Sequence, residues 1–419
     1  MESLEEIATG VRTGRVDPVA LVEEALRRAD ESADLNAVVH LDAEGARKAA
    51  AGHDRTGALA GVPVLVKEIV EVAGLPYRCG SAAMDEIGRQ DADVVRRLRA
   101  AGAIVIGLSY THEFAYGCTG TSNRVGPCRN PHDPARMTGG SSAGAGAAVA
   151  AGVVPLAIGT DTAGSVRIPA ALCGVVGFKP SYGTLSTDRV FPLSQSLDHV
   201  GVLTRTVADA AYALEALTGV PLAAERPTRL GVVTNPEYLD FTAEVGAAWS
   251  AALARLAAAG AELVDVELPD WQHSFTTAAA IQGPEAVANH TGRPTAQDQP
   301  DVRERLREAA QITRAEYDAA RTDAATITAE VNGVLGQVDA VLMPTVLCTA
   351  PLITDVDTPE GSKAVRSQLL KNTRLANLTR HPAVSLPLPT DGLPVGLQVI
   401  AATNSQAATT THWIENRLS

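Results

Sequence analysis

The sequence predicts an α/β protein, and two observations carry this prediction. Short apolar segments alternate along the chain with segments whose apolar residues recur at helical spacing. The 419 residues are 46% hydrophobic and 20% charged, which is a globular composition with ample material for a large core. No repeat or long low-complexity linker divides them. We expect one domain over residues 1–419, with two lobes at 1–220 and 228–419 joined by the Pro- and Ala-rich turn between them.

The clearest alternation lies in the first part of the chain. Asp17 and Pro18 predict a helix start, because Asp is a favourable N-cap and Pro is tolerated at the first helical position. The segment GVPVLVK at 61–67 predicts a short apolar strand that ends at a lysine. A helix is expected at 92–101 and a buried strand at 103–107.

The elements that follow extend the same pattern. A turn of Gly and Ser begins at 139 and runs into an alanine-rich helix that ends near 152. The remaining expected elements are strands at 153–158, 174–178, 230–234, 338–345, 382–388 and 395–400, and helices at 247–259 and 302–335.

Charge and cysteine content narrow the class of protein. The net charge of −13 provides no basic stripe to neutralise phosphates, so we expect no nucleic-acid partner. The five cysteines are scattered and form no C-x-x-C pair, which predicts a reduced compartment without a disulfide framework or metal site. The acidic start MESLEEIATG resembles neither a signal nor a transit peptide, and the Gly/Ala stretch at 143–159 is too short to span a membrane. We therefore expect a cytoplasmic protein.

The glycine-rich region allows three hypotheses about chemistry. The first is nucleotide binding, with the phosphates held at a helix N-terminus. Against it, GGSSAGAG lacks the G-K-[ST] ending of a phosphate-binding loop, and GAGAAV lacks the last glycine of a dinucleotide fingerprint. The segment at 140–144 fits G-x-S-x-G with Ser142 as nucleophile, although a polar segment with two prolines stands where a buried strand is required. The third hypothesis joins Lys67, Ser141 and Ser165.

This third hypothesis uses a lysine as the base. A serine hydroxyl needs a partner that removes its proton, and a lysine can do so only when it is neutral. Burial beside the apolar residues of VPVLV lowers a lysine pKa. A second serine can relay the proton between Lys67 and Ser165. The backbone N–H groups of Thr162, Ala163, Gly164 and Ser165 are candidates for an oxyanion hole, since small residues let a carbonyl approach closely.

The segment MTGGSSAGAGAAVAAGVVPLAIGTDTAGSVRIPAALCGVVGFKPSYG closely resembles the signature of the amidase signature family. GVPVLVKEIVEVAGLPYRCGS is similar to the lysine-bearing strand and loop of that family, and FPLSQSLDHVGVLTRTVADAA, NLTRHPAVSLPLP and LPVGLQVI are similar to its later segments. The resemblance covers nearly the whole chain. It implies a large mixed β-sheet core surrounded by α-helices, and it implies no metal and no organic cofactor.

The resemblance also implies roles for individual residues. Ser165 corresponds to the nucleophile, Ser141 to a bridging serine that follows a cis peptide bond, and Lys67 to the general base and acid. Asp161 and Arg167 are expected to brace the loop that carries Ser165. Gly139 and Gly140 are further candidates for substrate binding. Ala163 departs from the usual glycine, and its methyl group is expected to narrow the site for a small substrate.

Several other polar residues have structural or functional interpretations. Asp198 and His199 suggest a Ser-His-Asp triad, but adjacent residues on an extended segment point to opposite faces, which favours a structural role. Glu113 suggests a carboxylate acid or base, but no second carboxylate that would complete such a catalytic pair is evident. Cys173 is expected in the core. Glu285 and His290 are candidates for substrate contact, and Arg189 and Arg314 for a carboxylate contact, although each arginine is also typical of a surface position.

The sequence thus predicts an amidohydrolase that forms an acyl-enzyme on Ser165 and acts on a small-molecule amide. One alternative is the A subunit of a tRNA-dependent amidotransferase, which releases ammonia from glutamine within a complex. Another is a catalytically idle scaffold with the same fold. A homodimer is compatible with the resemblance, and the identity of the amide is left open.

Overall fold

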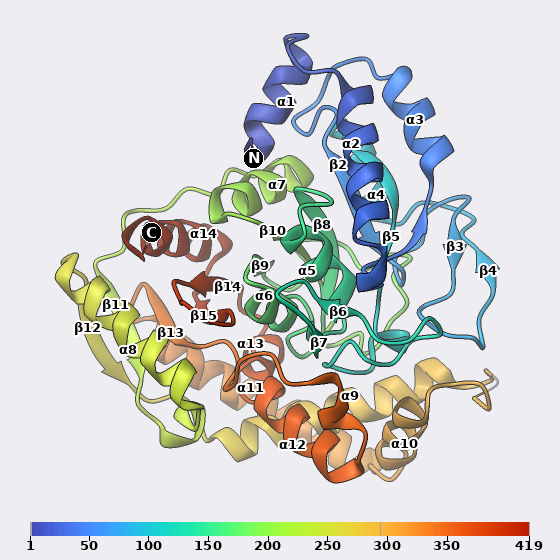
Figure 1. The fold of residues 1–419 in the computed structure, drawn as a ribbon. Helices are drawn as coiled ribbons and strands as arrows, with labels where there is room; N and C mark the ends of the chain where they lie inside the picture. The colour runs from blue at the N-terminus through green and yellow to red at the C-terminus, as the bar shows by residue number, and fades with distance from the viewer. Residues whose placement is uncertain (1, 294, 419) are drawn as a thin grey trace.

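An eleven-stranded mixed β-sheet runs through the computed structural model, which describes residues 2–293 and 295–418 (Figure 1). In sheet order the strands are β1 (Val38–Leu41), β5 (Ile104–Ser109), β2 (Pro63–Lys67), β8 (Leu156–Asp161), β10 (His199–Thr204), β9 (Val176–Lys179), β14 (Ala383–Leu388), β15 (Val395–Ile400), β13 (Ala340–Pro344), β11 (Arg229–Val233) and β12 (Glu262–Val266). Two small sheets pair β3 (Pro76–Tyr77) with β4 (Glu86–Ile87) and β6 (Arg129–Asn130) with β7 (Asp133–Met137).

The described helices surround this sheet. The α-helices are α1 (Leu4–Arg12), α2 (Pro18–Glu31), α3 (Ala43–Ala51), α4 (Asp93–Ala100), α5 (Ala143–Ala150), α6 (Arg167–Cys173), α7 (Val207–Thr218), α8 (Ala243–Ala258), α9 (Trp271–His290), α10 (Pro300–Ala309), α11 (Arg314–Leu335), α12 (Pro359–Leu370), α13 (Arg374–Leu378) and α14 (Asn404–Leu418). The short 3-10 helices are η1 (Ala33–Leu35), η2 (Glu113–Ala115), η3 (Pro236–Leu239) and η4 (Ile353–Val356). The α/β class and the mixed sheet surrounded by helices are confirmed.

The sheet is mixed because parallel and antiparallel neighbours occur side by side. β2 is parallel to both β5 and β8, and β11 is parallel to both β12 and β13. β14 and β15 form an antiparallel pair between β9 and β13, so late strands of the chain connect the strands of the two expected lobes. Figure 1 shows β11 and β12 at one end of the molecule and the N-terminal helices at the other.

Local sequence signals explain the best-predicted elements. The Asp17 side chain accepts a hydrogen bond from the Val19 N–H, and Pro18 occupies the first turn of α2. All five residues of β2 are buried, as expected for a strand with parallel neighbours on both sides. This burial carries Lys67, the last residue of β2, into the interior.

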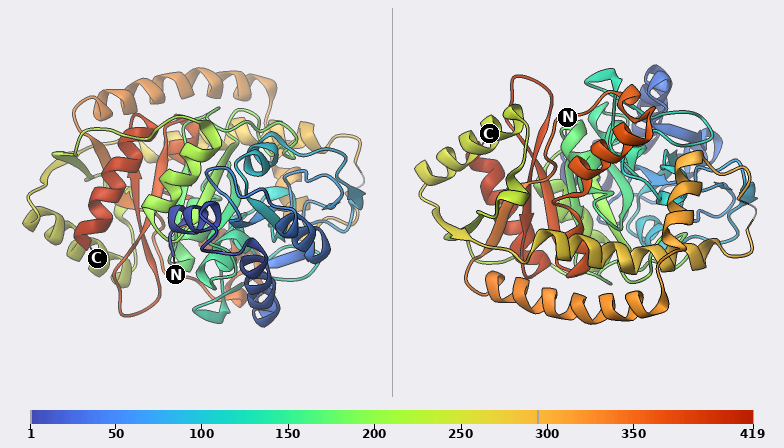
Figure 2. Two further views of the ribbon diagram at one scale, coloured as in Figure 1. Left: turned by 90° about the horizontal axis from the view of Figure 1, so that it is seen from above. Right: turned by 90° about the horizontal axis from the view of Figure 1, so that it is seen from below.

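The prediction of a single helix over 302–335 is wrong, because two helices occupy this region. α10 ends at Ala309, and α11 begins after Thr313. The Thr313 side chain accepts a hydrogen bond from the Glu316 N–H, and the Glu316 carboxylate accepts one from the Thr313 N–H. The capping signal T-R-A-E was therefore present in the sequence. α11 then packs against α9 along the outside of the molecule (Figure 2).

The helices α5 and α6 position the two loops that carry the candidate serines. α5 packs against β8 and α6, and α6 packs against β9 and β14. The glycine turn precedes α5 and the loop at 162–166 precedes α6, so this packing brings the two loops together. Within the described residues, no helix is both long and apolar enough to cross a membrane.

Gly144 in α5 provides a test of this close packing. A Cβ atom on Gly144 would lie 2.1 Å from the Ala37 carbonyl oxygen and 2.3 Å from the Tyr110 backbone nitrogen. We expect Gly144→Ala to lower the free energy of unfolding by about 1–3 kcal/mol, because backbone atoms on two neighbours must move. Gly333 is a matched control within α11, since nothing lies within 4 Å of the position that a methyl group would take there, and alanine should stabilise by about 0.5–1 kcal/mol. Chemical denaturation measures both changes, and a stabilising Gly144→Ala would contradict the packing.

Candidate active site

A cavity of about 370 Å³ opens beside the loop that follows β8. Thr162, Ala163 and Ser165 line it from this loop. The other walls come from residues 115–118, from the helices α9, α10 and α12, and from Arg374 at the start of α13. The cavity is therefore enclosed by segments that are distant in the sequence.

Lys67 lies fully buried next to two hydroxyl groups. Its Nζ donates hydrogen bonds to Ser141 Oγ at 2.7 Å and to Thr160 Oγ1 at 2.8 Å. Burial lowers the pKa of Lys67 to about 7, while the carboxylates of Asp161 and Asp198 act in the opposite direction. A lysine with this pKa is neutral in a large fraction of molecules near pH 7. In that form its nitrogen can accept a proton from Ser141.

Ser141 and Ser142 form the end of the glycine turn. The peptide bond between Gly140 and Ser141 is cis, as the resemblance implied. The Ser142 N–H donates to the Ser165 carbonyl oxygen at 3.2 Å, which joins this turn to the loop that carries Ser165. The structure thus brings Lys67, Ser141 and Ser165 into one buried region, with Ser165 on the cavity wall.

The conformation around Ser165 depends on Gly164. Gly164 has a φ of +126°, and a Cβ atom there would lie 2.4 Å from Thr373 Oγ1. The Thr373 hydroxyl donates to the Ala163 carbonyl oxygen, which fixes the loop from α13's side. Ser165 itself is only 6% exposed, and its exposure is to the cavity.

One of the four expected oxyanion donors is differently placed. The Gly164 N–H donates to Asp161 Oδ1 at 2.7 Å, so this amide points to the interior carboxylate and not to the cavity. Gly164 is also absent from the residues that line the cavity, whereas Thr162, Ala163 and Ser165 are present. The amide of Gly164 is therefore occupied, and the amides of the other three residues stay candidates for the oxyanion hole.

A fully buried ion pair holds the loop from beneath. Arg167 donates from Nη2 to Asp161 Oδ1 at 2.8 Å and from Nε to Oδ2 at 3.0 Å. Burial alone would raise the pKa of Asp161, but the charge and hydrogen bonds of Arg167 hold it well below its usual range. Arg167 also donates to Gln398 Oε1 and to Asn377 Oδ1, each at 2.6 Å. Asp161 and Arg167 thus connect the loop to β15 and α13.

Gly139 and Gly140 lie in the turn that precedes α5. Neither lines the cavity. Gly139 packs against Ile168, and the Gly140 N–H donates to the Cys118 carbonyl oxygen at 2.7 Å. Both are covered by their own neighbours and shape the turn, so this geometry does not support the expectation that they bind substrate, which stays a prediction.

Ser142 has a setting that does not fit the nucleophile-elbow hypothesis. Its Oγ donates to the Thr160 carbonyl oxygen at 3.0 Å and accepts from the Thr160 N–H at 3.2 Å. Ser142 is buried and does not line the cavity. The strand before the turn, β7, is short and partly exposed. Ser142 is therefore a structural contact between the turn and β8.

Asp198 and His199 point to different partners, as expected for adjacent residues on an extended segment. Asp198 Oδ1 accepts a hydrogen bond from Thr162 Oγ1 at 2.6 Å, and its Oδ2 accepts from the N–H groups of Leu193 and Ser194. Burial raises the pKa of Asp198 to about 7. The Nδ1 of His199 lies 2.7 Å from the Leu197 carbonyl oxygen. This arrangement positions Thr162 and forms no triad with Ser165.

The other polar candidates from the sequence do not line the cavity: Glu113, Glu285, His290, Arg189 and Arg314. Glu285 accepts hydrogen bonds from two serines and a tyrosine. Arg189 pairs with Glu71, and Arg314 pairs with Asp318 on the surface. Cys173 is buried in the core, as expected. Across residues 2–293 and 295–418, no group of three or more His, Cys, Asp or Glu side chains is arranged to hold a metal ion.

Sequence reasoning missed the residues that support the loop from far along the chain. Thr373, Asn377 and Gln398 contact it across more than 200 residues. Gln398 had a visible signal, because it is a polar residue in the middle of the apolar strand VGLQVI. Arg374 and its neighbours in the cavity had none, since isolated arginines in helices are typical of a surface.

Comparisons with known proteins agree with this geometry. The family model described as amidase matches residues 20–409. A 2-amino-5-chloromuconic acid deaminase of Comamonas testosteroni is 37% identical over 430 residues, which cover 97% of this chain and 93% of that protein. The A subunit of the glutamyl-tRNA(Gln) amidotransferase of Acidothermus cellulolyticus is 33% identical over 454 residues, which cover 94% of this chain and 87% of that protein. A crystal structure described as an amidase matches over the whole of both chains, with a TM-score of 0.93 and 36% identity.

Proposed function

Because this chain belongs to the amidase family, we propose that it hydrolyses the C–N bond of a small-molecule amide through an acyl-enzyme on Ser165. The observation that carries the proposal is the 2.7 Å contact between Lys67 Nζ and Ser141 Oγ, beside a serine that lines a cavity. The lowered pKa of Lys67 supplies a base in the neutral form.

The proposed reaction has two halves. Neutral Lys67 takes a proton from Ser141 while Ser141 takes the proton of Ser165, and the Ser165 oxygen forms a bond to the amide carbon. The negative oxygen of the tetrahedral intermediate accepts hydrogen bonds from the amides of Thr162, Ala163 and Ser165. The C–N bond then breaks, and the leaving nitrogen receives the proton from Lys67 through Ser141. Water attacks the acyl-enzyme with help from the same relay and releases the acid.

The proposal predicts a defined pH dependence. Because the base must be neutral, kcat/KM should fall by about tenfold for each pH unit well below an apparent pKa near 7. The pKa of Asp198 lies in the same range, so Asp198→Asn is the control. The acid limb should persist in it at a lower pH, because the Asp198 carboxylate no longer raises the pKa of Lys67. The temperature dependence of the apparent pKa provides a second check, because amine ionisation shifts strongly with temperature and carboxylate ionisation hardly does. A limb that disappears in Asp198→Asn would assign the titration to that carboxyl instead.

The deciding experiment is release of ammonia or amine by the purified chain from aliphatic, aryl, amino-acid and urea-derived amides, with glutamine included. Turnover of at least one amide supports the proposal. Turnover of glutamine alone, increased by a co-purifying partner, would favour the second candidate, the glutaminase component of an amidotransferase. The similarity to the amidotransferase A subunit of Acidothermus cellulolyticus is the observation that favours this second candidate. No turnover on any amide, with or without a partner, would favour the idle scaffold.

A further inference from the structure

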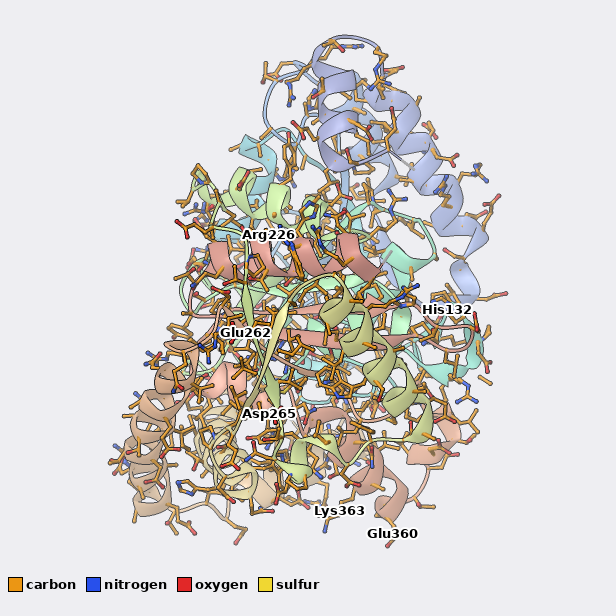
Figure 3. All side chains as sticks on the ribbon, turned by 90° about the vertical axis from the view of Figure 1, so that its left-hand side faces the viewer. His132, Arg226, Glu262, Asp265, Glu360 and Lys363 are labelled. Carbon is orange, nitrogen blue, oxygen red and sulfur yellow. The ribbon has the colours of Figure 1, made fainter. Side chains whose placement is uncertain are left out.

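The cavity contains an unusual accumulation of positive charge. Its lining includes Arg305, Lys363, Arg366 and Arg374, against one acidic residue, Glu308. Glu308 is exposed, as is Lys363, which Figure 3 shows on α12 close to Glu360. The chain as a whole has a net charge of −13, so this local excess runs against the overall composition.

Within the part of the chain that the structure describes, only one of these cations has a partner of opposite charge. Arg305 forms an ion pair with Asp301 at 2.9 Å and also donates to the Tyr116 carbonyl oxygen. Among the described residues, neither Arg366 nor Arg374 lies within ion-pair distance of a carboxylate. The Nε of Arg374 is buried without a hydrogen-bond partner among them. Two guanidinium groups therefore lie in the cavity wall without a carboxylate at ion-pair distance among the described residues.

This arrangement is electrostatically unfavourable without a ligand. Burial lowers the pKa of Arg374 to about 10, and the charges of Arg366 and Arg305 act in the same direction. Burial and the charge of Arg305 also lower the pKa of Arg366, while the carboxylates of Glu308 and Asp301 act in the opposite direction. Buried charges are normally paired, because an isolated ion loses its hydration without compensation. An anion between the two guanidinium groups would remove this penalty.

The Arg374 guanidinium is held in place by contacts with Phe275. Its Cζ lies 4.2 Å from the centroid of the Phe275 ring, and its Nη1 lies 3.5 Å from the Phe275 carbonyl oxygen. A planar guanidinium fixed by stacking is preorganised to bind a carboxylate with two parallel hydrogen bonds. Lysine could not supply this geometry.

The arginine is also directly connected to the loop that carries Ser165. Arg374 follows Thr373, whose hydroxyl donates to the Ala163 carbonyl oxygen. Arg374, Ala163 and Ser165 all line the same cavity of about 370 Å³. A small molecule in that cavity can therefore present an amide carbonyl to Ser165 and an anionic group to the arginines at the same time.

We propose that the substrate is a small amide that also carries a carboxylate, and that Arg374 and Arg366 bind this carboxylate. The proposal rests on the proposed function and narrows its substrate class. Arg374 and Arg366 determine specificity and take no part in proton transfer. Neutral alkyl and aryl amides of the same size are expected to be poor substrates.

Matched substrates test the proposal. Succinamate and glutaramate are compared with their methyl esters at the carboxylate end, which have the same amide and no charge. The native chain should show a kcat/KM at least about tenfold higher for the charged amides. Arg374→Gln should remove most of this difference, mainly through a higher KM for the charged amides. Arg374→Lys should restore part of it.

Further variants separate specificity from folding. Arg366→Gln is the second test variant. Arg366 lies on α12 and forms no ion pair with any described residue, so its replacement removes no ion pair from the fold. Arg307→Gln is the matched control, since Arg307 is an exposed arginine of the adjacent helix α10 and does not line the cavity. Its substrate preference should equal that of the native chain. Equal kcat/KM for charged and neutral amides, or a preference that survives in both Arg374→Gln and Arg366→Gln, would overturn the proposal.

A binding measurement keeps this test independent of catalysis. Calorimetric titration of succinamate and glutaramate into Ser165→Ala, which cannot form the acyl bond, should show binding that weakens at least about tenfold when Arg374→Gln is added. This result would support the carboxylate site even if no amide were hydrolysed. Absence of binding for both compounds would overturn it. Hydrolysis of neutral amides without a carboxylate preference would leave the proposed function intact while contradicting this inference.

Discussion

Ser165→Ala should lower kcat by about 10⁴-fold or more on whichever amide the native chain hydrolyses. The variant retains the loop, its amides and the cavity, but no oxygen is left to form the acyl bond. Because alanine fits the space of serine, KM and the far-UV circular dichroism spectrum should change little. Rapid-quench mass spectrometry should detect an acyl adduct on the native chain and none on the variant.

Ser142→Ala is the control for this experiment. Ser142 is also buried in the glycine turn, but its hydroxyl is occupied by the backbone of Thr160. Losing these hydrogen bonds should cost about 1–3 kcal/mol of stability, and kcat should stay within about tenfold of the native value. Loss of turnover in Ser142→Ala with retention in Ser165→Ala would refute the assignment and favour the nucleophile-elbow hypothesis.

Arg167→Met should lower the free energy of unfolding by about 3–5 kcal/mol, which is the largest stability effect that we expect from a single substitution in this loop. The change leaves the Asp161 carboxylate fully buried without its counter-ion. It also removes the donors to Gln398, Asn377 and the Thr373 carbonyl. Activity should fall as well, since the loop that carries Ser165 loses its attachment to β15 and α13.

The matched control for this change is Arg314→Met. Arg314 pairs with Asp318, but its side chain is 82% exposed, and such surface pairs contribute about 0–1 kcal/mol. The double variant Asp161→Leu/Arg167→Met should be less destabilised than the sum of its single changes, because no buried charge is then left unpaired. Chemical denaturation measures the native chain, Asp161→Leu, Arg167→Met, their double variant and Arg314→Met. An Arg167→Met variant as stable as Arg314→Met would show that the buried pair does not hold the loop.

The pair of Asp161 and Arg167 also makes the free energy of unfolding depend on pH. The folded-state pKa of Asp161 lies below its value in the unfolded chain, so the unfolded state binds the proton more readily. The contribution of Asp161 is therefore fully present above about pH 4 and is lost as the pH falls toward the folded-state pKa.

The sequence predicted those parts of the fold that depend on neighbouring residues. The cap at Asp17 and the apolar run of β2 are local signals, and both elements were found. The order of strands was not predictable, because β14 pairs with β9 across some 200 residues and no local pattern specifies that partner. The break between α10 and α11 was missed although Thr313 and Glu316 signal it.

The candidate site divides in a similar way. Lys67, Ser141 and Ser165 were named from the resemblance, because they lie in motifs with a fixed order along the chain. The occupied amide of Gly164 could not be predicted, because it depends on the direction of a single N–H group. Arg374 was missed because two features make it a candidate: it lines the cavity, and its Nε is buried without a hydrogen-bond partner among the described residues. Both features depend on the folded structure.

The position of β14 and β15 at the middle of the sheet has a consequence for the order of synthesis. Until these strands leave the ribosome, β9 and β13 each lack a neighbour, and the two parts of the nascent chain have open edges that can pair wrongly with other chains. The same late segment brings Gln398, one of the groups that Arg167 binds. A ribosome-bound or prematurely ended chain therefore contains Ser165 but lacks one of the side chains that hold the loop around it.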